Sequence, residues 1–98
     1  MKYLVIVETN VSDPSWVNEY LEKVTPLVSA FGGRYLTRTS DIELLEGATA
    51  PQYSLVAEFP SETAALEFYD SEEYEPYKLN RQSGSESRFL LVPVENGS

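Results

Sequence analysis

The segment that decides the fold is residues 52–69, which read QYSLVAEF, then PS, then ETAALEFY. In the first part, apolar side chains alternate with a more polar set, the two-residue period of a strand with one face in a core. Pro60 and Ser61 end this strand, and Ser61 is a good N-cap for a short helix over residues 62–69. The segment therefore predicts a strand whose helix-facing side chains are Tyr53, Leu55, Ala57 and Phe59, followed at once by a helix.

The segments on either side extend this pattern into a complete order of elements. Upstream, residues 2–9 and 34–39 read as strands, separated by a helix that begins at Asp13 and Pro14 and ends at Gly32-Gly33. Residues 42–45 are expected to continue the second strand after a break, as a bulge or a short arm. Downstream, Ser71 caps a further helical stretch that includes Arg81, residues 82–85 form a polar turn, and residues 87–94 form the last strand.

The resulting order, βαββαβ, predicts an α+β, ferredoxin-like domain that spans residues 1–98. Its four strands form one antiparallel sheet, with the helical segments on one face. The first strand is apolar on both alternating sets of side chains, and so is most of the last. Because the helices can cover only one face of the sheet, the apolar side chains on the other face predict a homodimer in which a second copy covers them. The alternative is that long loops of the same chain cover this face.

Composition excludes several classes of site and partner. The 98 residues carry a formal net charge of -9, which disfavours nucleic acid and anionic membrane surfaces as partners. The chain has no Cys and no His, so thiolate chemistry, a Ser–His–Asp triad and His-ligated metals are excluded, and we expect neither a metal nor a cofactor. Without a signal-like or membrane-length apolar segment, the expected location is the cytoplasm.

Five short segments carry a resemblance to a known family. They are GGRYLTR (32–38), LEG (45–47), EFPS (58–61), AALEFY (64–69) and SEEY (71–74). Together they resemble the DUF1330 family of the dimeric α+β barrel superfamily. The resemblance implies a face-to-face dimer and a pocket between the concave face of the sheet and the surrounding helices and loops. The loop at residues 48–51 (ATAP) departs from the family, many members of which carry an aromatic and a basic residue there.

Strand alternation and the resemblance together nominate candidate site residues. Glu58 is expected on the open face of its strand, opposite Arg38 or Arg34 on the neighbouring strand. Such a site can bind a carboxylate or enolate through spare guanidinium donors, although an Arg–Glu pair between strands can equally be a structural salt bridge. Tyr69, Tyr74 and Arg81 are the other candidate ligand-binding residues, with core and dimer packing as the alternative for the two tyrosines.

The loop that contains Glu46-Gly47 gives a second candidate carboxylate. Gly47 is expected to supply a positive φ for a turn, and Glu46 can be a turn acceptor, an interface partner or a pocket acid. If the protein is an enzyme, Glu58 or Glu46 is the candidate base, with Arg38 or a tyrosine stabilising the oxyanion.

Three functions therefore stay open from the sequence. The first is a binding protein for a small acidic or aromatic metabolite, the second is a cofactor-free isomerase or oxygenase, and the third is a structural dimer without a ligand. A carboxylate inside the cavity, away from an arginine, would favour the enzyme. A chain without a sizeable cavity would favour the structural dimer.

Overall fold

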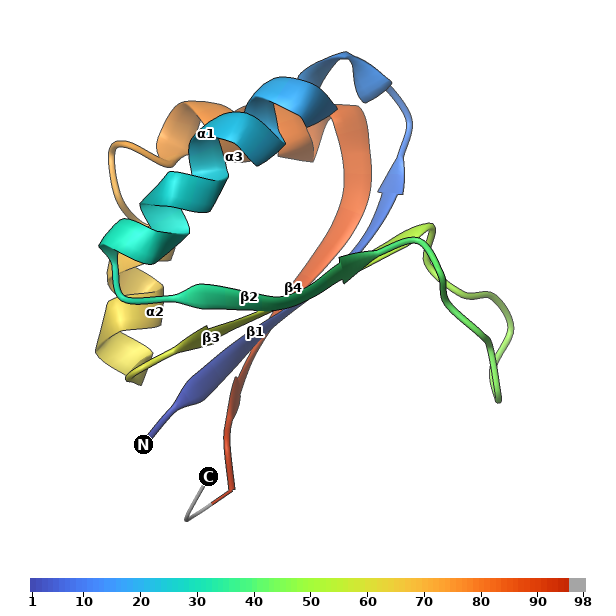
Figure 1. The fold of residues 1–98 in the computed structure, drawn as a ribbon. Helices are drawn as coiled ribbons and strands as arrows, with labels where there is room; N and C mark the ends of the chain where they lie inside the picture. The colour runs from blue at the N-terminus through green and yellow to red at the C-terminus, as the bar shows by residue number, and fades with distance from the viewer. Residues whose placement is uncertain (96–98) are drawn as a thin grey trace.

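The computed structural model describes residues 1–95, which form one four-stranded antiparallel sheet with helices packed over one face (Figure 1). The elements are β1 (Tyr3–Val11), a 3-10 turn (Pro14–Trp16), α1 (Val17–Ala30), β2 (Arg34–Thr39), β3 (Tyr53–Phe59), α2 (Glu62–Tyr69), α3 (Glu75–Gly84) and β4 (Ser85–Pro93). The strand order is β2-β3-β1-β4. This arrangement confirms the predicted ferredoxin-like βαββαβ fold.

The side chains predicted as caps accept backbone hydrogen bonds at the start of the 3-10 turn, at the start of α2 and in the turn ahead of α3. Asp13 accepts a hydrogen bond from the backbone N–H two residues later at 3.0 Å, ahead of the turn that leads into α1. Ser61 accepts from the backbone N–H three residues later at 3.1 Å and caps α2. Ser71 accepts in the same way at 3.2 Å, just before α3. These bonds satisfy N–H groups that have no partner within the helix.

The pair Gly32-Gly33 ends α1 and turns the chain into β2. Gly32 has φ of +85°, a left-handed conformation that glycine adopts without steric cost. The N–H of Gly33 donates to the carbonyl of Val28 at 2.8 Å, and the N–H of Gly32 donates to that of Ser29 at 3.0 Å. This hydrogen-bond pattern is the Schellman motif. It positions β2 directly beside β3, at one edge of the sheet.

The core lies between the sheet and the helices and is rich in aromatic rings. Phe68 of α2 stacks on Phe59 of β3 with ring centroids 5.6 Å apart, and it also meets Tyr74 at 4.5 Å. Tyr74 and Phe59 are among the most completely buried side chains of the protein. Because rings of this size bury large apolar areas, they hold α2 and the start of α3 against the sheet.

A bulge in β2 differs from the sequence prediction, which placed the irregularity after the strand. Tyr35 pairs with Ala57 and Thr37 pairs with Val56, so Leu36 is an extra residue without its own partner in β3. An extra residue reverses the side of the sheet to which the following side chains point. The bulge therefore moves Arg38 from the predicted open face to the helix-covered face.

The expected strand extension at residues 42–45 does not form. These residues belong to a long loop between β2 and β3, which reaches out from the body of the molecule (Figure 1). Gly47 has φ of +123°, which confirms the predicted positive φ in this loop. The loop exposes Leu44 and Leu45, and the side chain of Leu45 is 85% exposed.

The junction between α3 and β4 also differs from the prediction. Residues 82–85 were expected to form a polar turn, but α3 continues to Gly84 and β4 begins at Ser85. The carbonyl of Gly84 accepts hydrogen bonds from the N–H groups of Ser12 and Asp13 at 2.9 and 3.0 Å. It also accepts from the Trp16 indole at 3.1 Å. These contacts with a distant segment keep the end of α3 helical.

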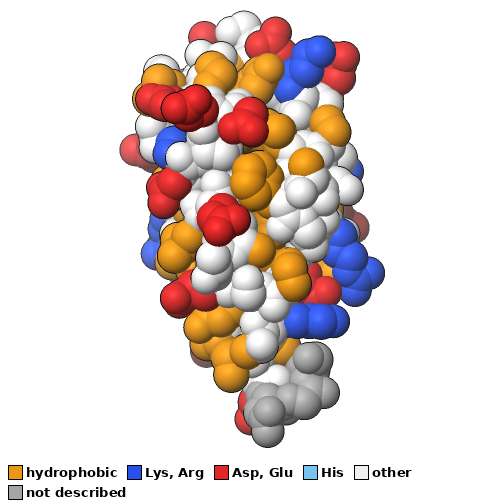
Figure 2. All heavy atoms as spheres, turned by 90° about the vertical axis from the view of Figure 1, so that its left-hand side faces the viewer, with side chains coloured by type: hydrophobic (Ala, Val, Ile, Leu, Met, Phe, Trp, Pro, Cys, Tyr) orange, Lys and Arg blue, Asp and Glu red, His pale blue; other side chains and the backbone are white. Residues whose placement is uncertain are grey.

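None of the helices described for residues 1–95 covers the second face of the sheet (Figure 1). In register, Leu4 lies opposite Val92 and Ile6 lies between Leu90 and Val56, so apolar side chains run across this face. Figure 2 shows another side of the molecule, the left-hand side of Figure 1. There, acidic side chains lie between the hydrophobic ones. Within residues 1–95, no helix combines the length and the apolar character needed to cross a membrane.

Candidate functional site

A cavity of about 350 Å³ lies between the sheet and α1. The sheet forms its floor through side chains that point towards the helices from β1 and β3: Val5, Val7, Thr9, Val11, Tyr53, Leu55, Ala57 and Phe59. The helical layer and its flanks supply Trp16, Val17, Tyr20, Leu21, Val28, Phe68 and Arg81. The remaining lining residues are Tyr35, Arg38, Thr39, Ser40 and Phe89. Most of this surface is apolar or aromatic.

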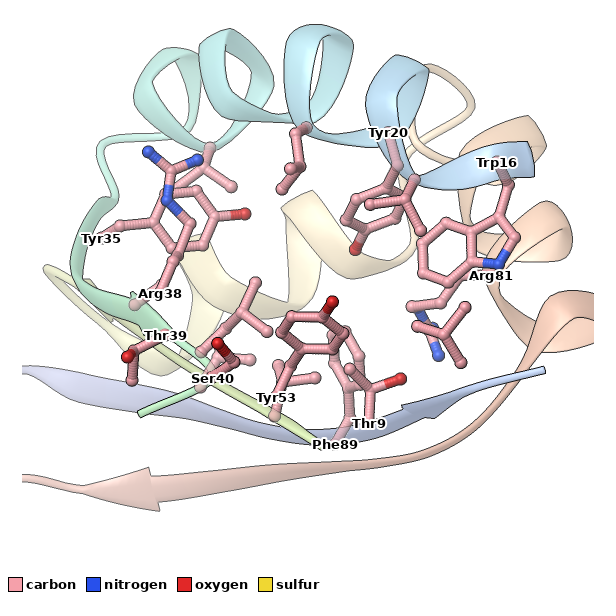
Figure 3. Close-up of a pocket in the computed structure, with 18 of the residues that line it drawn as sticks. Thr9, Trp16, Tyr20, Tyr35, Arg38, Thr39, Ser40, Tyr53, Arg81 and Phe89 are labelled. Carbon is pink, nitrogen blue, oxygen red and sulfur yellow. The ribbon is translucent and has the colours of Figure 1, made fainter. Parts of the chain in front are cut away.

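Two arginines lie at opposite ends of the cavity (Figure 3). Arg38 lies at one end beside Tyr35, and Arg81 lies at the other beside Trp16. The lining contains no Asp or Glu, although the chain has 16 acidic residues. The cavity therefore carries two positive groups within an otherwise acidic protein, which favours an anionic ligand there.

Arg81 is the more unusual of the two arginines. It is 4% exposed, and its guanidinium lies 4.1 Å from the centroid of the Phe89 ring. Its Nε is buried without a hydrogen-bond partner, and no carboxylate of residues 1–95 forms a salt bridge with it. Burial opposes the charged form, but the nearby phenols, Tyr74 first, outweigh it and the pKa of Arg81 lies above its ordinary value. Arg81 is thus a buried cation with an unused donor.

Arg38 is held at the open end of the cavity. Its Nη1 donates to the hydroxyl of Thr25 at 2.7 Å, and its guanidinium lies 4.3 Å from the centroid of the Tyr35 ring. Burial raises the pKa of Tyr35 to about 12, with a smaller upward effect of Tyr74 and a downward effect of Arg38. At neutral pH, Tyr35 is therefore a neutral phenol beside the guanidinium of Arg38.

The buried tyrosines are proton donors rather than bases. The hydroxyls of Tyr20 and Tyr74 share a hydrogen bond of 2.6 Å. Burial raises the pKa of Tyr20 well above its ordinary value, and the neighbouring Tyr74 raises it further. Burial also raises the pKa of Tyr74, although Arg81 acts in the opposite direction. Both phenols therefore stay protonated at neutral pH.

The structure separates Arg38 from Glu58, so the predicted pairing of these two residues is wrong. The bulge in β2 turns Arg38 towards the cavity, whereas Glu58 lies on the opposite face. The alternative partner, Arg34, is the residue opposite Glu58, and its Nε lies 3.3 Å from the carboxylate. Lys2 adds a second cation at 3.6 Å. Glu58 is thus held between two cations, away from the cavity.

The other predicted residues divide between the cavity and its surroundings. Arg81 lines the cavity, whereas Tyr69 and Tyr74 do not. Tyr74 is fully buried in the core, and Tyr69 lies beside Phe89 and beneath the ammonium of Lys78. Glu46 lies in the exposed loop between β2 and β3.

Several lining residues were assigned to packing in the sequence analysis or given no role. Trp16, Tyr20 and Tyr53 belong to this group, as does Thr9 at the end of β1. The alternation of β3 already placed Tyr53 on the helix side, which was a usable signal. Thr9 had no comparable signal, because its role depends on hydrogen bonds to β4. Among residues 1–95, no three His, Cys, Asp or Glu side chains gather closely enough to hold a metal ion.

Solved structures share this fold at low sequence identity. A protein of unknown function from Rhodopseudomonas palustris aligns with a TM-score of 0.81 and 17% identity, over 96% of this chain and 83% of the other. SnoaB, a cofactor-independent oxygenase from Streptomyces nogalater, aligns with a TM-score of 0.69 and 14% identity, over 97% and 94%. A dimeric ferredoxin-like protein of unknown function from Jannaschia sp. aligns with a TM-score of 0.71 and 6% identity, over 96% and 100%.

These structural likenesses establish the fold and leave the activity open. No curated protein matches the chain. Residues 2–94, nearly the whole chain, match a domain family of unknown function. The segments that suggested this family in the sequence all lie within the matched range. The chain belongs to the family described as the domain of unknown function DUF1330.

Proposed function

We propose that this protein is a homodimeric binding protein for a small molecule that joins a flat, apolar body to an anionic group. The observation that carries the proposal is the cavity lining, which includes Arg38 and Arg81 but no carboxylate. Its volume of about 350 Å³ falls within the range of small-molecule sites, about 300–1,000 Å³. Apolar walls with a few polar groups are also typical of such sites.

The physical support is that Arg81 is buried without a carboxylate partner, with its Nε donor unused. A buried cation is stabilised by a carboxylate or by a similar anion, and no carboxylate of residues 1–95 pairs with it. A bound carboxylate or enolate would supply that partner through charge-assisted hydrogen bonds. The aromatic residues Trp16, Tyr20 and Phe89 would then contact the apolar body of the ligand.

Two observations support a homodimer formed through the open sheet face. Apolar side chains cross this face in register, and two of them, Leu90 and Val92, are 39% and 37% exposed. A face-to-face partner would bury them together with Leu4 and Ile6, which favours association. One structural neighbour is described as a dimeric ferredoxin-like protein.

The cavity lining supports binding over catalysis by a carboxylate base. An isomerase or oxygenase that uses Glu58 or Glu46 would need one of these groups beside the substrate, and neither belongs to the lining. The presence of a sizeable cavity counts against a purely structural dimer. A binding protein is therefore the function that the geometry supports best.

The test combines a binding measurement with a mass measurement. Benzoate and larger aromatic carboxylates are titrated into the protein by calorimetry and in a thermal-shift assay, alongside the matching neutral amides. We expect the acids to bind and to raise Tm, and the amides to bind at least about tenfold more weakly. Light scattering is expected to give twice the 11.0 kDa mass of the chain. Equal binding of acids and amides, or no binding of either, would contradict the proposal.

A further inference from the structure

We infer that the Arg81 end of the cavity recognises an aromatic hydroxy acid: an anionic oxygen for Arg81 and a neighbouring hydroxyl donor for Thr9. This inference rests on the proposed function and narrows its ligand class. It follows from the direction of a chain of hydrogen bonds that ends at Thr9, and from the buried Nε of Arg81, which has no hydrogen-bond partner within residues 1–95.

Three hydroxyl groups form a chain from the cavity to the end of α3. The hydroxyls of Thr9 and Ser87 lie 2.6 Å apart across the β1–β4 pair, and those of Ser87 and Ser85 lie 2.8 Å apart along β4. The hydroxyl of Ser85 donates to the backbone carbonyl of Arg81 at 2.6 Å. The chain therefore connects Thr9, in the floor of the cavity, to the backbone of Arg81.

The last bond fixes the direction of the other two. A hydroxyl has one hydrogen and can donate only once. Because Ser85 donates to a carbonyl, which cannot donate back, its oxygen must accept from Ser87. Ser87 has then used its hydrogen and must accept from Thr9. The hydrogen of Thr9 is thus committed to Ser87, and its oxygen can only accept a hydrogen bond from a ligand.

Two other polar groups near this end already have partners. The Trp16 indole N–H donates to the carbonyl of Gly84 at 3.1 Å, and the hydroxyl of Tyr20 is paired with that of Tyr74. The Nε of Arg81 is a donor without a partner, and Thr9, which is 5% exposed, offers lone pairs. Figure 3 shows Thr9, Arg81 and Phe89 on the same side of the cavity.

These two unused groups define complementary chemistry in a ligand. Arg81 calls for an acceptor, best an anion, and Thr9 calls for a donor such as a hydroxyl. A methyl ether in place of the hydroxyl would bring its oxygen against the oxygen of Thr9. Both oxygens would then be acceptors, and no hydrogen bond could form between them. The aromatic side chains of Trp16 and Tyr53 in the lining favour a flat ligand body. An aromatic hydroxy acid meets all three requirements.

The experiment compares each hydroxy acid with its own methyl ether. Meta-hydroxybenzoate and mandelate provide two spacings between the hydroxyl and the carboxylate, and benzoate serves as the reference acid. For at least one spacing, we expect the hydroxy acid to bind at least about tenfold more tightly than its ether in calorimetry. Equal affinity of hydroxy acid and ether at both spacings would overturn the inference.

A variant tests the direction of the hydroxyl chain itself. Ser85→Ala removes the group that fixes the direction, so Ser87 becomes free to donate to Thr9 and Thr9 becomes free to donate to an ether. We expect the preference for the hydroxy acid to fall to about threefold or less, mainly because the ether binds more tightly. The matched control is Ser83→Ala, since Ser83 makes the equivalent hydroxyl bond to Leu79 on the exposed side of α3. This control should keep the wild-type preference.

The outcomes separate this inference from the proposed function. The inference fails, and anion binding stands, if benzoate binds but neither hydroxy acid binds more tightly than its methyl ether. The same holds if Ser85→Ala leaves the preference for the hydroxy acid over its ether unchanged. If no aromatic acid binds at all, both fail. Circular dichroism spectra of the variants are compared with that of the wild type, so that a lost preference for the hydroxy acid is not mistaken for unfolding.

Discussion

At the scale of single residues, Arg81 combines a stability cost with an opportunity for binding. The residue is 4% exposed, and no group of residues 1–95 forms a hydrogen bond with its Nε. Burying a cation costs free energy, and the Phe89 ring and the Tyr74 phenol offset this cost without supplying an anion. A bound anion is the partner that we propose for its unused Nε.

We therefore expect Arg81→Met to abolish binding of aromatic carboxylates without destabilising the protein. Replacing a poorly paired buried charge with an apolar side chain is often neutral or stabilising, so urea unfolding should give a free energy within about 1 kcal/mol of wild type, or above it. The matched control is Lys23→Met, which removes an exposed cation of α1 that lies 4.0 Å from Glu22 and should keep binding. A loss of about 3 kcal/mol or more in Arg81→Met would assign Arg81 a structural role instead.

Gly33 shows how closely the backbone approaches the core at the start of β2. A Cβ atom at this position would lie 2.6 Å from a ring carbon of Phe59, a side chain that is 1% exposed. Because Phe59 cannot move without disturbing the core, Gly33→Ala should lower the free energy of unfolding by about 1–3 kcal/mol in chemical denaturation. Ser29→Ala, at an exposed position near the end of α1, should change it by less than about 0.5 kcal/mol. Equal stability of the two variants would show that Phe59 has room to shift.

The sequence was a better guide to which residues are candidates for the site than to where their side chains lie. Arg81 was selected as a candidate and does line the cavity, but Arg38 reached the cavity for a reason that the sequence did not reveal. Strict alternation put Arg38 on the face of Glu58, and one extra residue at Leu36 reversed this. A bulge depends on how two strands pair, so a single strand pattern does not predict it.

At the scale of elements, the signals that act locally were reliable. The predicted caps Asp13, Ser61 and Ser71 all accept backbone hydrogen bonds, since a cap depends only on residues two or three positions away. The end of α3 was misjudged, because its polar sequence is typical of a turn. Its helical form depends on Ser12, Asp13 and Trp16, which are distant in sequence. Tertiary contacts overrode the local preference there.

The tyrosines between α1, β2 and α3 give the packing of these elements a dependence on pH. Burial raises the pKa of Tyr35 to about 12, against about 10 in an unfolded chain. Between these values the folded protein keeps a proton that the unfolded chain has lost. The stabilisation is thus complete below pH 10 and is lost as the pH rises to 12, by up to about 1.4 kcal/mol per unit. The raised pKa values of Tyr20 and Tyr74 act in the same direction.

Urea unfolding between pH 9 and pH 12 measures this effect, with Tyr35→Phe as the comparison. The side chain of Tyr35 lies against Arg38, and its replacement removes one titrating hydroxyl while keeping the ring. The variant should lose stability less steeply than wild type as the pH rises from about 10. Identical slopes would mean that Tyr35 titrates alike in the folded and unfolded chains.

At the scale of the whole molecule, the order of elements and the layers were predictable, because four strand patterns and the helical patterns between them admit few topologies. The lining of the cavity was not predictable in the same way, because it combines residues of β1, β2, β3 and the helices that no single segment of the sequence brings together. The sequence did predict an apolar open face, because the first strand and most of the last carry apolar side chains on both alternating sets. The register now places Ile6 between Leu90 and Val56, near the middle of that face.

This position makes Ile6→Asp a direct test of the homodimer. A carboxylate there would be buried without a partner between two sheets, so we expect unfolded or insoluble protein rather than a folded dimer. Leu66→Asp is the matched control, because Leu66 is also an exposed apolar residue but lies on α2, away from the open face. It should stay folded, with twice the mass of one chain by light scattering. If Ile6→Asp is soluble, folded and still dimeric, the partner docks elsewhere, and the loop that exposes Leu44 and Leu45 becomes the next surface to test.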